Sequence, residues 1–164
     1  ISQILRNPVS KRMHKSQIFF ATQTGNSQEV AEKLQEELGE SGIEVECVDM
    51  FDSDPENISE LSNLYYVVST WGEGEPPDDS VGYFEKLKEY PDGHYSGKRF
   101  AICGLGDSGY DIFNGFGKDL ESELKRLGGV GIVERVDCDI DFEELSDPWI
   151  AKIVEHEKAL QAEG

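Results

Sequence analysis

The sequence predicts an α/β domain built on a doubly wound parallel sheet of five strands, with helices on both faces. Two observations support this fold class. Five short segments, each apolar or alternating between apolar and polar residues, are separated by segments of helical periodicity, as in consecutive strand–helix–strand units. Glycine- or hydroxyl-rich loops follow the first, third and fourth of these strands. Because ligands bind such sheets at the carboxyl ends of the strands, we expect the three loops to enclose one ligand.

The first strand is predicted at residues 18–21, a short aromatic run typical of an interior parallel strand. A helix is predicted from Gln28 to about Gly39, because four apolar residues recur on one helical face: Val30, Ala31, Leu34 and Leu38. Asn26 is expected to cap this helix, with Glu29 returning the hydrogen bond.

The turn between this strand and this helix has the composition of an anion site. Its six residues are small or neutral hydrogen-bonding residues: Thr22, Gln23, Thr24, Gly25, Asn26 and Ser27. Amides at a helix start attract anions, hydroxyls add donors, and Gly25 can take the positive φ that a tight nest of amides needs. The turn has no Lys or Arg and no P-loop pattern, so a terminal monophosphate fits better than a nucleoside triphosphate with magnesium. On this stretch alone, an ordinary polar turn is an equally good interpretation.

The middle of the chain supplies two further strands and the second loop. Residues 43–48 alternate between apolar and polar positions, whereas residues 64–68 are apolar almost throughout, so the latter strand is expected to be central. The loop at residues 69–78 contains two glycines and two prolines and cannot be regular structure. A helix is expected to follow from Asp79 or Ser80, with its apolar side at Val81, Phe84 and Leu87.

The last third of the chain supplies two more strands and two helices. Strands are predicted at residues 99–103 and 130–136, and a long glycine-spaced loop follows the first of them at residues 104–117. The next helix carries Leu120, Leu124 and Leu127 and is expected to end at Gly128-Gly129. The final helix is expected to start near Asp147-Pro148, a cap followed by proline in the first turn, and to bury Trp149, Ile150, Ile153, Val154 and Leu160.

Residues 104–109 match the dinucleotide-binding pattern Gly-x-Gly-x-x-Gly, but we interpret the match as accidental. A dinucleotide-binding glycine turn opens a helix at once, whereas residues 110–117 intervene here. The acidic residue expected about 20 positions later is missing. The pattern also follows the fourth strand, where such a fingerprint would follow the first.

Composition excludes several classes of function. The formal net charge is −19, so the folded body should repel nucleic acid and anionic membranes and attract a basic protein partner. No apolar run approaches the length of a membrane span. An odd number of thiols, each in or beside a predicted strand, indicates a reducing, cytoplasmic compartment without a disulfide framework. Metal-ligand spacing is absent among the histidines and cysteines: His14, His94, His156, Cys47, Cys103 and Cys138.

Residues 1–16 show no apolar periodicity and are expected to be a basic leader or linker ahead of one domain at residues 17–164. Their only charges are basic: Arg6, Lys11, Arg12 and Lys15. A flexible, solvated tail is the favoured interpretation, and contact with an acidic partner or a membrane is the alternative.

Taken together, three motifs resemble those of the flavodoxin-like FMN-binding domains. They are Thr22-x-Thr24-Gly25-Asn26, the run Ser-Thr-Trp-Gly-Glu-Gly at residues 69–74, and Gly-Leu-Gly-Asp-Ser-x-Tyr-x-x-Phe-Asn at residues 104–114. The resemblance implies a sheet of order 2-1-3-4-5 with FMN at its switch point. The second and third motifs are most similar to the FMN modules of diflavin reductases, such as sulfite reductase flavoprotein and cytochrome P450 reductase. Trp71 departs from that pattern and is more similar to free flavodoxins.

The resemblance assigns most residues of the three loops to FMN. The turn at residues 22–27 would hold the phosphate, while Trp71 and Tyr110 would stack on the two faces of the isoalloxazine ring. The peptide Gly72-Glu73 would turn over beside flavin N5, a movement that a residue without Cβ makes easy. The rest of the pocket would be Ser69, Thr70, Gly74, Leu105, Gly106, Asp107, Phe113, Asn114 and, on the rim, Asp139.

The function implied by the resemblance is electron transfer. Such a domain would carry single electrons, through FMN semiquinone and hydroquinone, from an NADPH- and FAD-containing reductase to a haem or iron–sulfur acceptor. Nearby carboxylates and an unneutralised phosphate would make the reduced flavin strongly reducing. The chain carries no FAD or NADPH domain, so it is not expected to oxidise NADPH alone. A free carrier and the module of a larger reductase stay equally open, and the alternatives are a flavin-free interaction module or an FMN quinone reductase.

Overall fold

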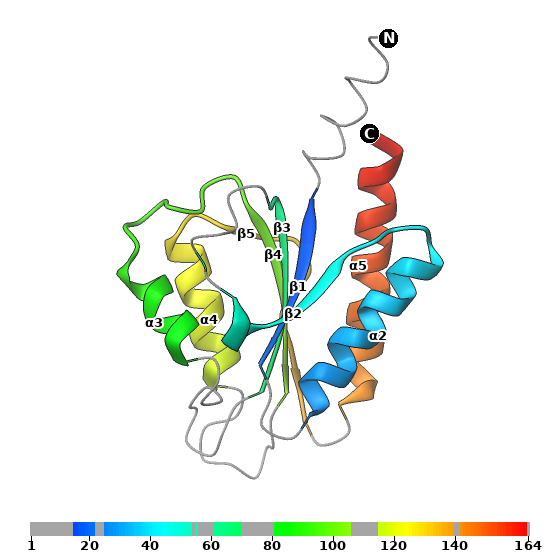
Figure 1. The fold of residues 1–164 in the computed structure, drawn as a ribbon, viewed down its shortest axis with the longest axis horizontal. Helices are drawn as coiled ribbons and strands as arrows, with labels where there is room; N and C mark the ends of the chain where they lie inside the picture. Colours follow the sequence, from blue (N-terminus) through cyan, green and yellow to red (C-terminus); the bar gives the residue numbers. More distant parts are fainter. Residues whose placement is uncertain are drawn as a thin grey trace.

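The structure, a computed structural model, describes residues 15–21, 25–53, 55, 61–69, 81–105, 115–139 and 142–163. Its parallel strands form one sheet in the order β2-β1-β3-β4-β5, with β6 also paired to β4 (Figure 1). The strands are β1 (Ser16–Ala21), β2 (Glu46–Asp49), β3 (Asn63–Ser69), β4 (Arg99–Leu105), β5 (Val130–Gly131) and β6 (Val136–Cys138). The predicted fold class and strand order are confirmed.

Helices cover both faces of the sheet in pairs. On one face lie α2 (Asn26–Glu40) and α5 (Glu143–Glu163), and on the other lie α3 (Val81–Glu89) and α4 (Gly115–Arg126) (Figure 1). A short 3-10 turn, η1 (Met50–Asp52), follows β2. Within the described residues, no helix is both long enough and apolar enough to cross a membrane.

Period-two alternation along the strands divides the core into two clusters. In β1, Phe19 and Ala21 point to the α3/α4 face, whereas Ile18 and Phe20 point to the α2/α5 face. The α3/α4 face is rich in rings: Phe19, Tyr66, Tyr83, Phe84, Tyr95, Phe100 and Phe116. The α2/α5 face is mainly aliphatic, with the two buried thiols among its members: Val30, Leu34, Leu38, Val67, Ala101, Cys103, Cys138, Ile150 and Ile153.

The single fifth strand predicted at residues 130–136 is instead two short strands. Both pair with β4: Val130 is opposite Arg99 and Gly131 opposite Phe100, while Val136 is opposite Cys103. The chain advances five residues from Gly131 to Val136, whereas the paired part of β4 advances only three, from Phe100 to Cys103. Two residues between β5 and β6 are therefore extra and do not pair with β4. The predicted strand position in the sheet is right, but its continuity is wrong, because two surplus residues cannot keep the register.

Two helix starts also differ from the predictions. The residue before α2 is Gly25, which has a φ of 95° and provides no side-chain cap, so the Asn26 cap is wrong and Asn26 is the first helical residue. Helix α5 begins at Glu143, so Pro148 lies inside it as the sixth residue. Proline has no amide to donate to the Glu144 carbonyl four residues earlier, so the helix continues past Pro148 without that hydrogen bond, and the predicted start near Asp147 is too late.

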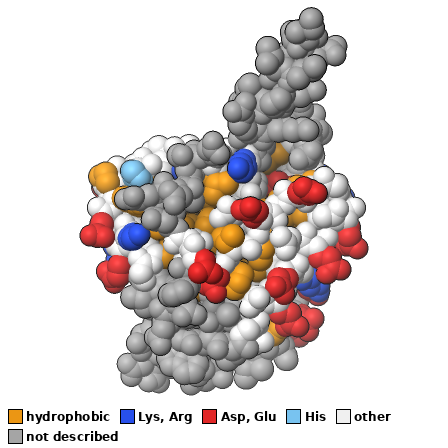
Figure 2. Space-filling model, viewed as in Figure 1, with side chains coloured by type: hydrophobic (Ala, Val, Ile, Leu, Met, Phe, Trp, Pro, Cys, Tyr) orange, Lys and Arg blue, Asp and Glu red, His pale blue; other side chains and the backbone are white. Residues whose placement is uncertain are grey.

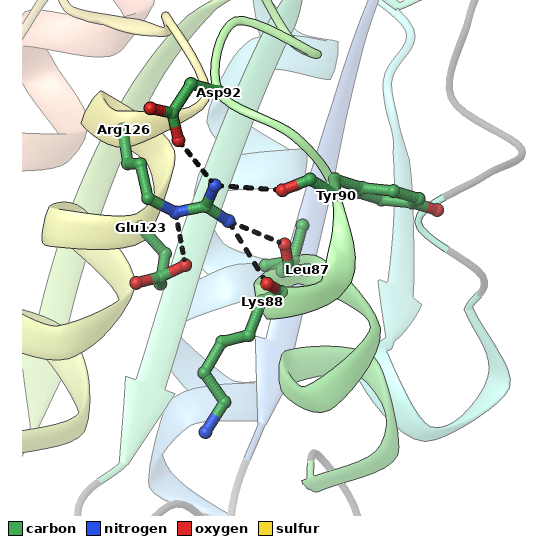
Figure 3. A network of polar contacts seen from close by, with 6 residues as sticks. All are labelled: Leu87, Lys88, Tyr90, Asp92, Glu123 and Arg126. Carbon is green, nitrogen blue, oxygen red and sulfur yellow. Dashed lines mark hydrogen bonds and ion pairs between the residues drawn. The ribbon is translucent and has the colours of Figure 1, made fainter.

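Arg126 joins the ends of α3 and α4 at the amino edge of the sheet (Figure 3). Its guanidinium donates to the carbonyls of Leu87 at 3.1 Å and Tyr90 at 2.8 Å. It also donates to the carboxylates of Asp92 and Glu123, each at 2.9 Å. These carbonyls come from the last turn of α3 and the residue after it, where few amides remain to satisfy them; the Leu87 carbonyl also accepts from the Tyr90 amide at 3.2 Å. Arg126 therefore fixes α3 against α4.

On the other face, a buried carboxylate fixes α5 to the sheet. Glu157, which is 2% exposed, accepts a hydrogen bond from Ser16 Oγ at 2.7 Å and another from the Tyr65 hydroxyl. Burial, with the Glu157 carboxylate beside it, raises the pKa of Tyr65. Figure 1 shows that β1 begins and α5 ends at this same amino edge, opposite the carboxyl ends of the strands.

Candidate functional site

The carboxyl ends of four strands are level at one edge of the sheet. Ala21 is opposite Val68, and Ser69, one residue further on, is opposite Leu105. Leu105 is in turn opposite Cys138. The loops after β1, β3, β4 and β6 therefore all leave from the same edge, as the sequence predicted.

The amino end of α2 lies at this edge and has no side-chain cap. Gly25 takes the left-handed conformation expected of it, with a φ of 95°. The carbonyl of Gly25 accepts from the Glu29 amide at 3.0 Å, which closes the first helical turn. Because a glycine cannot cap, the amides of this turn have no side-chain acceptor at the cap position. Together with the helix dipole, this arrangement suits a bound anion.

A hydrogen bond between two serines joins the first loop to the second. Ser27, in the first turn of α2, is fully buried, and Ser69 is the last residue of β3. Their Oγ atoms lie 2.5 Å apart, and either hydroxyl can be the donor. This bond holds the start of α2 against the end of β3, so the point where the β1 loop ends is fixed beside the point where the β3 loop begins.

An arginine fixes the segment between β5 and β6 near the same edge. Arg135 donates to the Asp137 carboxylate through Nε at 2.9 Å and through a terminal nitrogen at 3.2 Å, and it also contacts Glu121 on α4. The hydrogen bonds with Asp137, which outweigh partial burial, raise the pKa of Arg135. Asp139, which the sequence predicts on the rim, comes two residues after Asp137.

Six of the predicted site residues fall within the described part of the chain. Gly25, Asn26 and Ser27 form the start of α2, Ser69 ends β3, Leu105 ends β4, and Asp139 follows β6. Leu105 is buried in the cluster on the α2/α5 face, so its side chain contributes to the core. Asp139 is half-buried. The other predicted site residues lie outside the described residues: Thr22, Gln23, Thr24, Thr70, Trp71, Gly72, Glu73, Gly74, Gly106, Asp107, Tyr110, Phe113 and Asn114.

Sequence reasoning missed two contacts at this edge. It named Ser27 and Ser69 separately but not the hydrogen bond between them, because they are 42 residues apart. It missed Arg135 altogether, although the spacing Arg135-x-Asp137 beside a strand is a local signal that could have drawn attention to it.

Among the charged side chains on the face formed around β2 and α2, carboxylates are in the majority. Figure 2 shows Asp and Glu side chains spread over this face, with few Lys or Arg among them. The described ion pairs include Lys33 with Asp147 at 2.7 Å, which links α2 to α5. The remaining exposed acids of α2, such as Glu29 and Glu36, leave this face negative.

A depression of about 450 Å³ lies away from this edge, between the end of α2 and the start of β2. Gln35 and Glu44 are among its lining residues, and Gln35 donates to the Val45 carbonyl at 2.9 Å. It shares no residue with the predicted site.

Comparison with known proteins gives consistent results. The flavodoxin family model matches residues 18–149. Sulfite reductase [NADPH] flavoprotein alpha-component from Bacillus subtilis is 38% identical over 137 residues, which is 84% of this chain and 23% of that protein. The Vibrio parahaemolyticus protein of the same name is 37% identical over 149 residues, 91% of this chain and 24% of its own. The chain thus spans about a quarter of the length of these relatives.

Solved structures with this fold include a flavodoxin from Streptococcus pneumonia TIGR4, with a TM-score of 0.77, 26% identity, and coverage of 91% of this chain and 99% of that one. A cysteine-to-serine mutant of flavodoxin from Pseudomonas aeruginosa superposes with a TM-score of 0.75 at 24% identity, covering 86% of this chain and 97% of that one. The predicted resemblance is therefore confirmed, both in fold and in the sequence relationship to reductase flavoproteins.

Proposed function

This chain belongs to the flavodoxin family, whose members bind FMN at the switch point of the sheet, and on that premise we propose that it is an FMN-dependent electron-transfer domain. The observation that carries the proposal is the alignment of four strand ends around an uncapped helix start. When bound there, FMN supplies reversible uptake and release of electrons.

The start of α2 is the proposed phosphate site. The amides of its first turn and the positive end of the helix dipole attract the anion, and Thr22, Thr24 and Ser27 add neutral donors. The hydrogen bond between Ser27 and Ser69 keeps this turn beside the end of β3. No cation is needed from the turn itself, so the phosphate would keep its charge.

The loops after β3 and β4 are the proposed site of the flavin ring. Trp71 and Tyr110 would stack on its two faces, and the Gly72-Glu73 peptide would contact N5. Leu105 and Asp139 stand at the bases of two of the enclosing segments, and the bidentate contact of Arg135 with Asp137 orients the second base. These residues bind and orient the ring and exclude water from it.

Electron exchange is proposed to occur with other redox proteins or domains. The acidic face around α2 would draw a basic partner into contact by long-range attraction. By analogy with the named relatives, the donor is an NADPH- and FAD-containing reductase unit, and the acceptor carries haem or an iron–sulfur centre. A cytoplasmic location remains a prediction from thiol usage.

Flavin titration tests the cofactor assignment. Flavin fluorescence is followed while the flavin-free protein is added to FMN and, separately, to riboflavin, which lacks the phosphate. We expect tight quenching with FMN and much weaker binding of riboflavin, because only FMN can use the α2 start. Equal affinities would contradict the phosphate site, and binding of neither flavin would favour the flavin-free interaction module.

A matched pair of serine variants tests the link between the loops. Ser69→Ala removes the partner of Ser27 and is expected to weaken FMN binding by roughly tenfold, the value of about one hydrogen bond. Ser41→Ala, at the exposed far end of α2, is the control and should leave affinity unchanged.

Electron transfer itself is tested with a reductase portion as the electron donor. The portion of the Bacillus subtilis relative beyond the matched quarter is mixed with NADPH and the FMN-loaded chain, and flavin bleaching is followed anaerobically. We expect bleaching that slows as salt is added, because screening weakens attraction to a basic partner. A rate that does not depend on salt would contradict the charge-guided encounter.

A further inference from the structure

Two cysteine thiols lie together inside the sheet, close to the candidate edge but outside the residues assigned to it. Cys103 on β4 and Cys138 on β6 are both fully buried, and their Sγ atoms are 3.7 Å apart. Apolar side chains of the same cluster, Trp149 and Ile150 among them, enclose this region. The hydrogen bond to Cys138, together with burial and the nearby Asp137, raises the pKa of Cys103, so its sulfur carries a proton at neutral pH.

The register of the strands works against a disulfide between them. Cys103 is opposite Val136, and Cys138 is opposite Leu105, so the two cysteines are diagonal neighbours on adjacent strands. With about 3.3 Å of rise per residue and about 4.8 Å between strands, their Cα atoms are roughly 8 Å apart. Disulfides need Cα atoms within about 7 Å, so direct closure would require the backbone to move.

A bridge through one additional atom suits the same spacing. A metal ion between two sulfurs lengthens the link between the strands, so the backbone can stay where it is. Zinc is a poor candidate because it takes four ligands, and the described residues contain no group of three or more His, Cys, Asp or Glu placed to hold a metal.

The apolar surroundings also restrict the charge that a bound ion can have. Two thiolates balance the charge of a divalent cation, whereas a monovalent ion such as copper(I) would leave a net negative charge buried among apolar side chains. Soft thiolate ligands in turn favour a soft ion. The ion that meets these conditions is soft, divalent and stable with two ligands, and the mercuric ion is an example of this class.

We propose that Cys103 and Cys138 form a bidentate site for a two-coordinate, thiophilic divalent metal ion. On binding, two S–H bonds break, two sulfur–metal bonds form, and two protons pass to the solvent; nothing is oxidised or reduced. Leu105 lies opposite Cys138 and Asp139 follows it, so the site adjoins the base of the candidate cofactor edge.

Mercury retention against a competing thiol tests the site. The purified, flavin-free chain is titrated with mercuric chloride and then challenged with an excess of 2-mercaptoethanol, and the mercury that stays bound is measured by mass spectrometry. We expect each chain to retain one mercuric ion and to release two protons on binding it. The ion is retained because, once one cysteine has bound it, the second cysteine acts as a ligand of high effective concentration. A parallel sample treated with diamide should form no Cys103–Cys138 disulfide.

Alanine variants of all three cysteines complete the test, with circular dichroism to verify folding. Cys103→Ala and Cys138→Ala should each lower retention at least tenfold, because a single thiol competes with the monothiol on equal terms. Cys47→Ala is the matched control, since Cys47 lies on β2 and should not affect retention. Equal losses in all three variants, retention only after the protein unfolds, or ready closure of the disulfide by diamide would each overturn the proposal. If either alanine variant does not fold, the proposal is tested by mercury retention in the Cys47→Ala protein and by the diamide treatment.

Discussion

The two faces of the sheet are built on the same strands but hold their helices by different means. On the α3/α4 face, stacked and edge-on rings fill the space, for example Phe84 against Phe116 at 5.2 Å and Phe19 against Tyr66 at 4.9 Å. A buried polar contact there is neutral, between the hydroxyls of Tyr66 and Tyr83. On the α2/α5 face, most of the buried side chains are aliphatic, and one buried polar contact there is made by a carboxylate, Glu157.

This difference indicates how each pair of helices is positioned. Rings bury a large area each, so single residues of the α3/α4 face have a high individual value. Among the described residues, the cluster on the α2/α5 face is equally numerous but mostly aliphatic, and this face relies on Glu157 to select one placement of α5. A buried carboxylate is costly unless its partners are in place, so an α5 shifted along the sheet would lose both hydroxyl donors.

The largest effect is expected from Phe116→Ala on the ring-rich face. Phe116 is fully buried and contacts Phe84, so its removal should lower the free energy of unfolding by about 3–5 kcal/mol. Urea unfolding measures the loss. Leu34→Ala on the opposite face is the comparison and should cost less, about 2–3 kcal/mol at the lower end for buried leucines. A larger loss for Leu34→Ala would refute the contrast between large rings on one face and smaller aliphatic side chains on the other.

The next effect is expected from Glu157→Ala, which leaves the hydroxyls of Ser16 and Tyr65 without their acceptor. Each buried donor left unpaired costs about 1–3 kcal/mol, so we expect a loss of roughly 2–4 kcal/mol in urea unfolding. Glu157→Gln keeps an acceptor oxygen and should cost clearly less. If glutamine and alanine destabilise equally, the carboxylate contributes through packing alone.

A smaller effect is expected from Tyr83→Phe on the ring-rich face. The variant removes one neutral hydroxyl of the pair with Tyr66, at an expected cost of about 1 kcal/mol. Thermal unfolding should show a small decrease in Tm. A loss as large as that of Glu157→Ala would mean that the neutral and charged contacts are equivalent, and the comparison between the faces would fail.

The smallest effect concerns the reactivity of the Cys47 thiol on β2, the strand at one margin of the sheet. Burial, aided by Glu32, raises the pKa of the Cys47 thiol to about 11. Because only the thiolate reacts, alkylation of Cys47 by iodoacetamide should be slow at pH 8 and should accelerate until the pH passes that value. The Cys103→Ala/Cys138→Ala double variant isolates this thiol in mass spectrometry. A rate that levels off near the pH of an ordinary thiol, about 8.5, would show that β2 opens readily.

Periodicity predicted most of the helices and strands. The buried residues of α5 followed from local patterns, since Trp149, Ile150 and Ile153 repeat on one helical face and are buried as expected. The strand order, in contrast, was implied by the resemblance to flavodoxin-like domains. The break between β5 and β6 could not be predicted in this way, because it depends on the count of residues opposite β4. The cap of α2 was wrong because Asn26 has a good capping side chain, yet Gly25 occupies the position that needs a positive φ.

The site was predictable in its location and less so in its contacts. Loops after successive parallel strands must share an edge, which brought Gly25, Ser69 and Leu105 together. Contacts between residues distant in sequence carried no local signal, such as Ser27 with Ser69 across 42 positions. The roles of Trp71 and Tyr110 stay predictions, because both lie outside the described residues.

The course of α5 has a practical consequence. Its 21 residues rise about 32 Å, from the candidate edge to the edge where β1 begins. A surface anchor attached near Ser16 or Glu163 would therefore hold the molecule with its candidate edge facing the solution. On an electrode, such an orientation should give little direct current but leave the protein able to exchange electrons with a diffusing mediator, whereas an anchor placed on Asp139 should do the reverse.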